Sequence, residues 1–151
     1  MKKYSSSIDL QIAAGLKNTP TKEFFKPMVD AILSEERVGL ELTIRIVSIE
    51  ESAYLNKKYR KIDGPTNVLS FVSDGVEKVA PDFLGDIVVC APVVNEEACQ
   101  QGKDVEAHWA HMIVHGILHL LGLDHEDSSQ AEVMENRERS ILSDLGYPDP
   151  Y

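Results

Sequence analysis

The most constraining feature of the sequence is a helical segment, 104–121, that carries two chemically different faces. Asp104 is expected to cap its start and Gly122 to end it. At about 100° per residue, one face gathers large apolar side chains: Trp109, Met112, Ile113, Ile117, Leu120 and Leu121. Beside them, within an arc of about 80°, lie four histidines: His108, His111, His115 and His119. The apolar face predicts a core helix, and the imidazole face requires a separate explanation.

The spacing of three histidines predicts a metal site. His115 and His119 are one helical turn apart, so their rings project side by side and can bind one ion. His125 would lie about 9 Å beyond His119 if the helix continued, at a rise of about 1.5 Å per residue. Gly122 removes this difficulty, because glycine can adopt the left-handed conformation that ends a helix and turns the chain back. We therefore expect His125 to reach the open side of the ion.

Three neutral imidazoles around Zn²⁺ leave one tetrahedral position open, as in catalytic rather than structural sites. We therefore predict one open metal site formed by His115, His119 and His125. Such an ion lowers the pKa of a bound water toward about 7 and polarises a phosphoryl or carbonyl oxygen. Metalloproteases place a glutamate after the first histidine of such a helix as general base, and this chain has Gly116 there. That difference disfavours a peptidase.

The other polar residues of this region have roles that the spacing leaves open. A structural role for His108 and His111, or a hydrogen bond to a metal ligand, is as consistent with the pattern as ligation itself. Asp124 can orient a ligand by hydrogen bonding or cap the turn before His125. His111 and Asp124 are therefore candidates for the hydrogen-bonded surroundings of the ion.

A short basic cluster stands out in an acidic chain. The 15 lysines and arginines against 25 acidic residues give a net charge of −10, which disfavours non-specific binding to a polyanion. The densest positive cluster comprises Lys57, Lys58, Arg60 and Lys61. A guanidinium group can bind phosphate oxygens bidentately, and lysines add point charges. The alternative is a solvated helix end, where cations favour the helix dipole.

The remaining pattern predicts one domain over residues 1–151, a length that suits a single core. Apolar alternation and short apolar runs predict strands at 8–12, 39–47, 68–72 and 87–91. Capping residues and helical periodicity predict further helices at 20–33, 48–60, 93–101 and 127–145. The first of these is expected to kink or to start late because of Pro27. Intermixed strands and helices indicate one sheet with helices packed on it.

The sequence also predicts where the protein works. No apolar stretch approaches the about 20 residues of a membrane span. Lys2 and Lys3 are not followed by the apolar segment of a signal peptide. Cys90 and Cys99 form no short metal-binding pair. We therefore expect a cytoplasmic protein with reduced cysteines and no membrane partner.

The segment 115–125, HGILHLLGLDH, resembles the H-G-x-L-H-L-x-G-x-D-H motif of the YbeY family of single-domain endoribonucleases. The resemblance extends upstream through 59–71, YRKIDGPTNVLSF, and through 84–87, LGDI, so it covers roughly the central half of the chain. Val72 is a departure, because members often have proline after the phenylalanine.

The resemblance implies an α+β fold with a mixed, mostly parallel four-stranded sheet and about five packed helices. It implies zinc on the three histidines of the motif, with Arg60 and His115 as catalytic residues. Arg60 is then the key cation of the active cleft, and the neighbouring lysines are candidates for substrate binding.

The resemblance further implies a single-strand-preferring endoribonuclease of ribosomal RNA maturation, acting at the 3′ end of 16S rRNA and in ribosome quality control. Its partners are then ribosomal RNA and components of the small subunit. Two alternatives remain open. One is a zinc-dependent hydrolase of peptide or amide bonds, and the other is a non-catalytic zinc-binding ribosome assembly factor.

Overall fold

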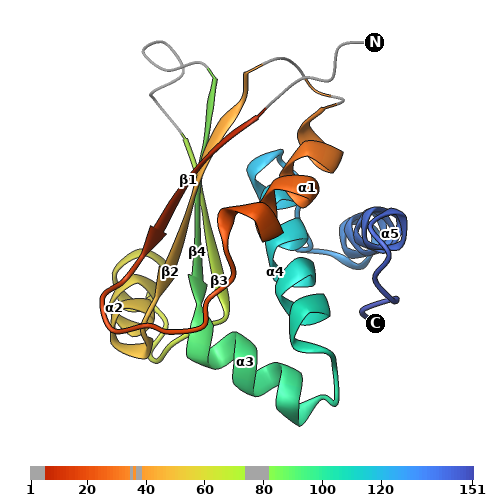
Figure 1. Ribbon diagram of the computed structural model, residues 1–151. Helices are drawn as coiled ribbons and strands as arrows, with labels where there is room; N and C mark the ends of the chain where they lie inside the picture. Colours follow the sequence, from red (N-terminus) through yellow and green to blue (C-terminus); the bar gives the residue numbers. More distant parts are fainter. Residues whose placement is uncertain (1–5, 35, 37–38, 74–81) are drawn as a thin grey trace.

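The computed structural model describes residues 6–34, 36, 39–73 and 82–151. Within them, four strands form one open sheet in the order β1-β2-β4-β3 (Figure 1). β1 and β4 both run parallel to β2, and β3 pairs antiparallel with β4 at the edge of the sheet. The strands are β1 (Ser7–Ile12), β2 (Glu41–Val47), β3 (Val68–Val72) and β4 (Phe83–Cys90). The predicted mixed, mostly parallel four-stranded sheet is confirmed.

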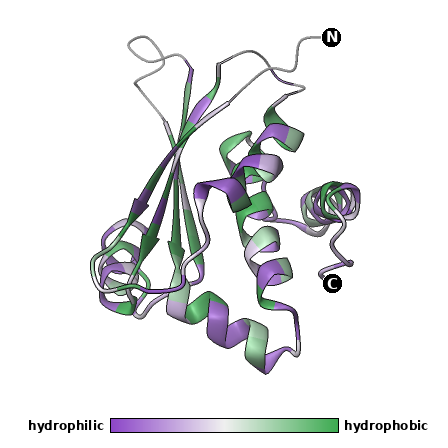
Figure 2. Cartoon of the chain, in the orientation of Figure 1, coloured by the Kyte–Doolittle hydropathy of each residue, from purple (hydrophilic) through white to green (hydrophobic). Residues whose placement is uncertain are grey.

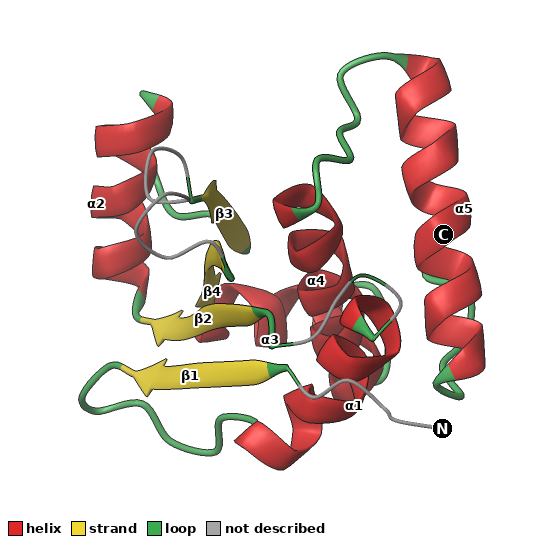
Figure 3. Ribbon diagram, turned by 90° about the horizontal axis from the view of Figure 1, so that it is seen from above, coloured by secondary structure: helices red, strands yellow, loops and turns green. Residues whose placement is uncertain are grey.

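The described part of the chain contains five helices that pack with this sheet in one domain, as predicted. They are α1 (Lys22–Leu33), α2 (Ile49–Arg60), α3 (Ala91–Gln100), α4 (Val105–Leu120) and α5 (Ser128–Asp144). Seen from above, α1 and α4 lie on one side of the sheet and α2 on the other, and α4 separates the sheet from α5 (Figure 3). None of the described helices is both long and apolar enough to cross a bilayer.

The core lies between the sheet and the helices α1 and α4. Hydrophobic residues run along the strands and through α4 (Figure 2). Trp109, Ile113 and Ile117 of α4 are buried in the same hydrophobic cluster as Ile44 and Ile87 of the sheet. These α4 residues belong to the apolar stripe expected from the helical period, so the neighbouring face of the helix is left for the histidines. A smaller cluster on the other face includes Val47, Leu69, Val88 and Cys90, with Leu55 of α2 against it.

Four predicted element starts differ from the structure by two residues or more. β2 begins at Glu41 rather than at residue 39, and α3 begins at Ala91 rather than at residue 93. The other two are the starts of α1 and β4.

α1 begins at Lys22 rather than at residue 20, which agrees with the expected late start. Thr21 has the extended conformation of an N-cap, its carbonyl accepts the first helical hydrogen bonds, and the helix then continues through Pro27. β4 begins at Phe83 rather than at residue 87, because its backbone pairing with β2 extends to Phe83, beyond the apolar run.

Gly85 allows β3 and β4 to approach closely beside α4. A Cβ at this position would lie 2.1 Å from the backbone oxygen of Phe71 and 2.9 Å from Cδ2 of Leu120, and φ is +146°. We expect Gly85→Ala to lower the free energy of unfolding by about 3 kcal/mol, from steric overlap and backbone strain together. Urea unfolding measures this change.

Gly64→Ala is the matched control for that prediction. Gly64 also has a positive φ, of +92°, but a Cβ there would meet no atom within 4 Å. It should therefore show only the backbone strain, of about 1 kcal/mol. Equal losses in the two variants would contradict the close approach at Gly85.

Candidate functional site

The helix α4 is held against the sheet at the point where its histidines begin to line a cleft. Asp104 caps the helix, and its carboxylate accepts a hydrogen bond of 3.3 Å from the backbone N–H of Ala107. A Cβ at Gly116 would lie 3.0 Å from Cγ2 of Ile87 and 3.3 Å from Oγ of Ser70. The absence of a side chain at Gly116 therefore allows α4 to pack closely against β3 and β4.

The turn after α4 directs His125 back along the helix. Gly122 has a φ of +100°, and the N–H of Leu123 donates to the carbonyl of Leu118 over 3.0 Å, which is a typical glycine-terminated helix end. Oδ1 of Asp124 accepts a hydrogen bond of 2.7 Å from the backbone N–H of His125. Asp124 therefore holds the turn that presents His125, and its Oδ1 also lies 3.8 Å from Nδ1 of that histidine.

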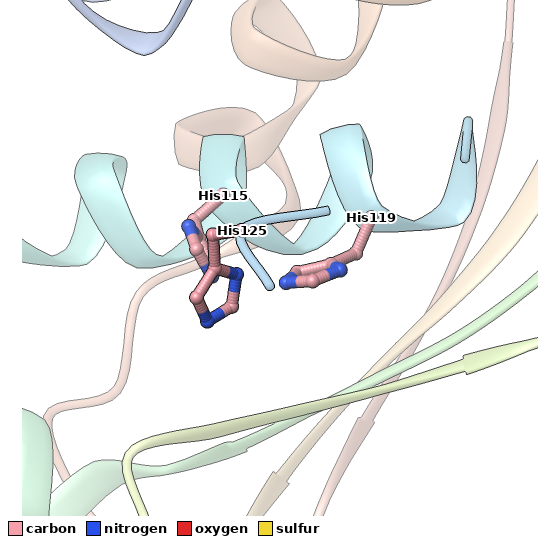
Figure 4. Close-up of side chains that lie close together, drawn as sticks. All are labelled: His115, His119 and His125. Atoms are coloured by element: carbon pink, nitrogen blue, oxygen red, sulfur yellow. The ribbon is translucent and has the colours of Figure 1, made fainter. Parts of the chain in front are cut away.

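The rings of His115, His119 and His125 converge (Figure 4). Each offers one nitrogen, and these atoms lie within 4.8 Å of one another. The ring centroids are 4.7, 5.1 and 5.3 Å apart. Burial, followed by the proximity of the other two histidines, lowers the pKa of His119 and favours its neutral, ligating form. The group could bind one metal ion.

A buried glutamate of α5 orients this group. Glu138 is fully buried, and its Oε1 lies 3.2 Å from Nδ1 of His115 and 3.1 Å from Nε2 of His111. The hydroxyl of Tyr151 donates toward both carboxylate oxygens, each 2.8 Å away. Burial alone would raise the pKa of Glu138, but the hydrogen bonds from His111, His115 and Tyr151 outweigh it and lower the pKa to about 2. The carboxylate is therefore ionised at neutral pH.

An ionised acceptor beside Nδ1 of His115 fixes the tautomer of that ring. The proton resides on Nδ1, so the lone pair of Nε2 remains available for a cation. Carboxylate–histidine pairs of this kind commonly orient metal ligands in proteins. The donor set and its hydrogen bonds thus fit a resident divalent cation.

The two remaining histidines of α4 lie outside the three-histidine group. His111 is buried beside Glu138 and therefore contacts the partner of a candidate ligand. His108 is also buried, and its Nε2 lies 2.9 Å from Oε1 of Glu97, which in turn accepts hydrogen bonds from the amide of Asn67. On α4, His115 and His119 therefore belong to the converging group, whereas His108 and His111 contact Glu97 of α3 and Glu138 of α5.

Sequence reasoning missed Glu138 and Tyr151. The pattern of α5 held a signal for the first of them. Met134, Ile141 and Leu142 form the buried stripe of α5, and Glu138 occupies the same stripe at helical spacing. A glutamate in an apolar stripe requires a buried partner.

Glu138→Gln is expected to weaken metal binding by about 10- to 100-fold, the usual effect of losing a group that orients a ligand. Glutamine keeps the shape but removes the charge that holds the proton on Nδ1 of His115. Competition with a zinc-binding dye measures the affinity. Glu132→Gln is the control, because it makes the same change at an exposed position of α5. Equal affinities in the two variants would show that Glu138 does not orient the site.

The three histidines line a cleft of about 1000 Å³. Its opposite wall comprises β3 and the end of α2, including Arg60. The guanidinium of Arg60 donates a hydrogen bond of 2.8 Å to the carbonyl of Ser70 and lies 5.7 Å from the ring centroid of Phe71. Among the described residues that line the cleft, Arg60 is the only lysine or arginine. One cation therefore faces the histidines across the cleft.

The three lysines beside Arg60 lie outside the described lining of the cleft. Nζ of Lys57 pairs with Asp63 at 2.9 Å, and both side chains are exposed. Nζ of Lys61 donates to the backbone carbonyl of Lys58. The basic cluster of the sequence thus separates into one arginine in the cleft and three lysines on the outer surface.

Known proteins resemble this chain over nearly its whole length. The family model described as "Endoribonuclease YbeY" matches residues 8–146. A relative named endoribonuclease YbeY from Methylococcus capsulatus is 53% identical over 145 residues, which are 95% of each chain. Another with that name, from Halorhodospira halophila, is 53% identical over 137 residues, 89% of each chain.

A solved structure shares the fold. The solution structure of a Thermotoga maritima protein matches with a TM-score of 0.57 and 24% identity, over 90% of this chain and 91% of that one. This likeness shows the fold alone, whereas the family model and the relatives show the family. From the family match over residues 8–146 and the relatives at 53% identity, the chain belongs to the YbeY family.

Proposed function

We propose that this protein is a zinc-dependent endoribonuclease that cleaves single-stranded RNA during the maturation of ribosomal RNA. The observation that carries the proposal is the convergence of three imidazoles across one cleft from a single arginine. The relatives named endoribonuclease YbeY support the reaction class.

His115, His119 and His125 would hold the ion. An all-imidazole set suits zinc among the common divalent cations, and three ligands leave a position for water or substrate. When bound, the ion supplies a Lewis acid that lowers the pKa of water and offsets charge on a phosphoryl oxygen. Glu138 keeps the ring of His115 in the tautomer that can ligate.

Arg60 would bind the scissile phosphate. Its hydrogen bond to Ser70 and its position over Phe71 hold the guanidinium at the wall of the cleft, while its other N–H groups are available for phosphate oxygens. A fixed donor of this kind stabilises charge that develops in the transition state.

The substrate would be ribosomal RNA, with the 3′ end of 16S rRNA as the site of maturation and defective ribosomes as a further target. A net charge of −10 disfavours tight binding of free RNA. We therefore propose that components of the small ribosomal subunit present the RNA to the cleft, in the cytoplasm.

Purified zinc-loaded protein is expected to cleave a single-stranded RNA, to lose this activity with a chelator, and to regain it when zinc is added back. Cleavage of a casein-like peptide with the RNA left intact would instead support a peptide or amide hydrolase. RNA or ribosome binding without turnover, and unchanged by the chelator, would support a non-catalytic assembly factor. Either result would overturn the proposal.

A further inference from the structure

Tyr59 leaves a large aromatic ring exposed in the wall of the cleft. Its side chain lines the cleft directly before Arg60, and the residue is 54% exposed. The ring packs edge-to-face on Phe71, with centroids 5.2 Å apart and an interplanar angle of 67°. Phe71 lines the same cleft from β3. Two rings from different elements thus form one aromatic surface in the cleft that the histidines also line.

One cation lies over each of these two rings. Nζ of Lys58 lies 5.2 Å from the ring centroid of Tyr59, and the guanidinium of Arg60 lies 5.7 Å from that of Phe71. Aromatic rings beside basic side chains are the combination by which proteins bind single-stranded nucleic acids, because each base has a π-face and each nucleotide carries a phosphate.

We propose that Tyr59 and Phe71 form a stacking subsite for one unpaired nucleobase, adjacent to the phosphate that Arg60 binds. This inference rests on the proposed function and names the part of the substrate that the cleft recognises. The faces of a base in a duplex are covered by its stacked neighbours, so only an unpaired base can contact the rings. The subsite therefore selects single-stranded RNA and tolerates different base identities.

The same helix contains a matched control. Tyr54 is 62% exposed and also lies near Lys58, with Nζ 5.7 Å from its ring centroid. Tyr54 is not part of the cleft lining, however. Both tyrosines are exposed, belong to α2 and lie near Lys58. Only Tyr59 lines the cleft.

The test measures the affinity of zinc-loaded protein for a short single-stranded RNA, together with kcat and KM for its cleavage. Tyr59→Leu keeps apolar bulk but removes the π-face, and it should weaken binding and raise KM by about 5- to 150-fold. Its kcat and zinc content should match those of the wild type, since the ring binds substrate without touching the ion. Tyr59→Phe and Tyr54→Leu should both behave like the wild type.

RNAs with a single abasic position locate the base that stacks. At one position, loss of the base should weaken binding to the wild type but not to Tyr59→Leu, because the stacking partner is already missing. Equal RNA affinities of Tyr59→Leu and Tyr54→Leu would overturn the subsite. So would an abasic RNA that loses the same affinity for the wild type and for Tyr59→Leu. In that case, unimpaired cleavage by the wild type would leave the proposed endoribonuclease intact. A wild type that neither binds nor cleaves RNA would overturn both.

Discussion

Replacing His119 with alanine is expected to reduce RNA cleavage by about 10³-fold or more. Loss of a single electrostatic donor in an active site usually lowers kcat by about 10²- to 10³-fold. This substitution removes a metal ligand, and with it the catalytic contribution of the ion. The half-buried ring of His119 faces His115 and His125, so its removal opens the group while leaving the pair formed by Glu138 and His115 in place. Single-turnover cleavage of a labelled RNA at saturating zinc measures the effect.

His108→Ala is the control for that experiment. It removes an imidazole from the same face of α4, but this ring contacts Glu97 rather than the converging group. The variant should retain its metal and most of its cleavage activity, although it is expected to be less stable. Wild-type cleavage by His119→Ala, measured in protein freed of contaminating nuclease, would contradict the metal-dependent mechanism.

Arg60→Ala is expected to lower kcat/KM by about 10²- to 10³-fold with zinc content unchanged. The guanidinium is the one lysine or arginine side chain in the described lining of the cleft, so no neighbouring cation in that lining replaces it. Arg60→Lys should recover only part of the loss, because an ammonium group cannot bind phosphate oxygens bidentately. Steady-state cleavage assays and elemental analysis of the same preparations measure both quantities.

Lys57→Ala separates the role of Arg60 from the charge of the basic cluster. Lys57 belongs to the same helix, but its ammonium group pairs with Asp63 outside the cleft lining. If local charge alone mattered, the two alanine variants would lose similar activity, and the loss would decrease as salt is added. We expect Lys57→Ala to remain close to the wild type. Comparable losses in both variants would contradict a specific phosphate contact by Arg60.

The parts of the fold that could be predicted are those specified by short-range patterns. The alternation in 41–47 produced β2, and Ser48 and Asp104 cap α2 and α4 through hydrogen bonds to backbone N–H groups three residues later. The start of β4 at Phe83 could not be predicted, because it depends on pairing with β2 rather than on its own side chains.

The candidate site shows the same division. The three histidines are predictable because two share a helix face and the third follows a glycine that reverses the chain. Glu138 lies 23 residues from His115, and its contact arises from the packing of α5 on α4. Tyr151 lies 13 residues from Glu138, and its contact arises because the segment after α5 folds back onto that helix. Likewise, the charge pattern did not distinguish Arg60 from the neighbouring lysines. The structure distinguishes them, because the side chain of Arg60 contacts Ser70 whereas that of Lys57 pairs with Asp63.

Metal content, measured by elemental analysis of the wild type beside His119→Ala, tests most directly whether three imidazoles share one divalent cation. We predict one zinc ion per wild-type chain after zinc loading and removal of excess metal, and almost none in the variant. A wild type without metal, or a variant that retains a full equivalent, would contradict the site on which the proposed reaction depends.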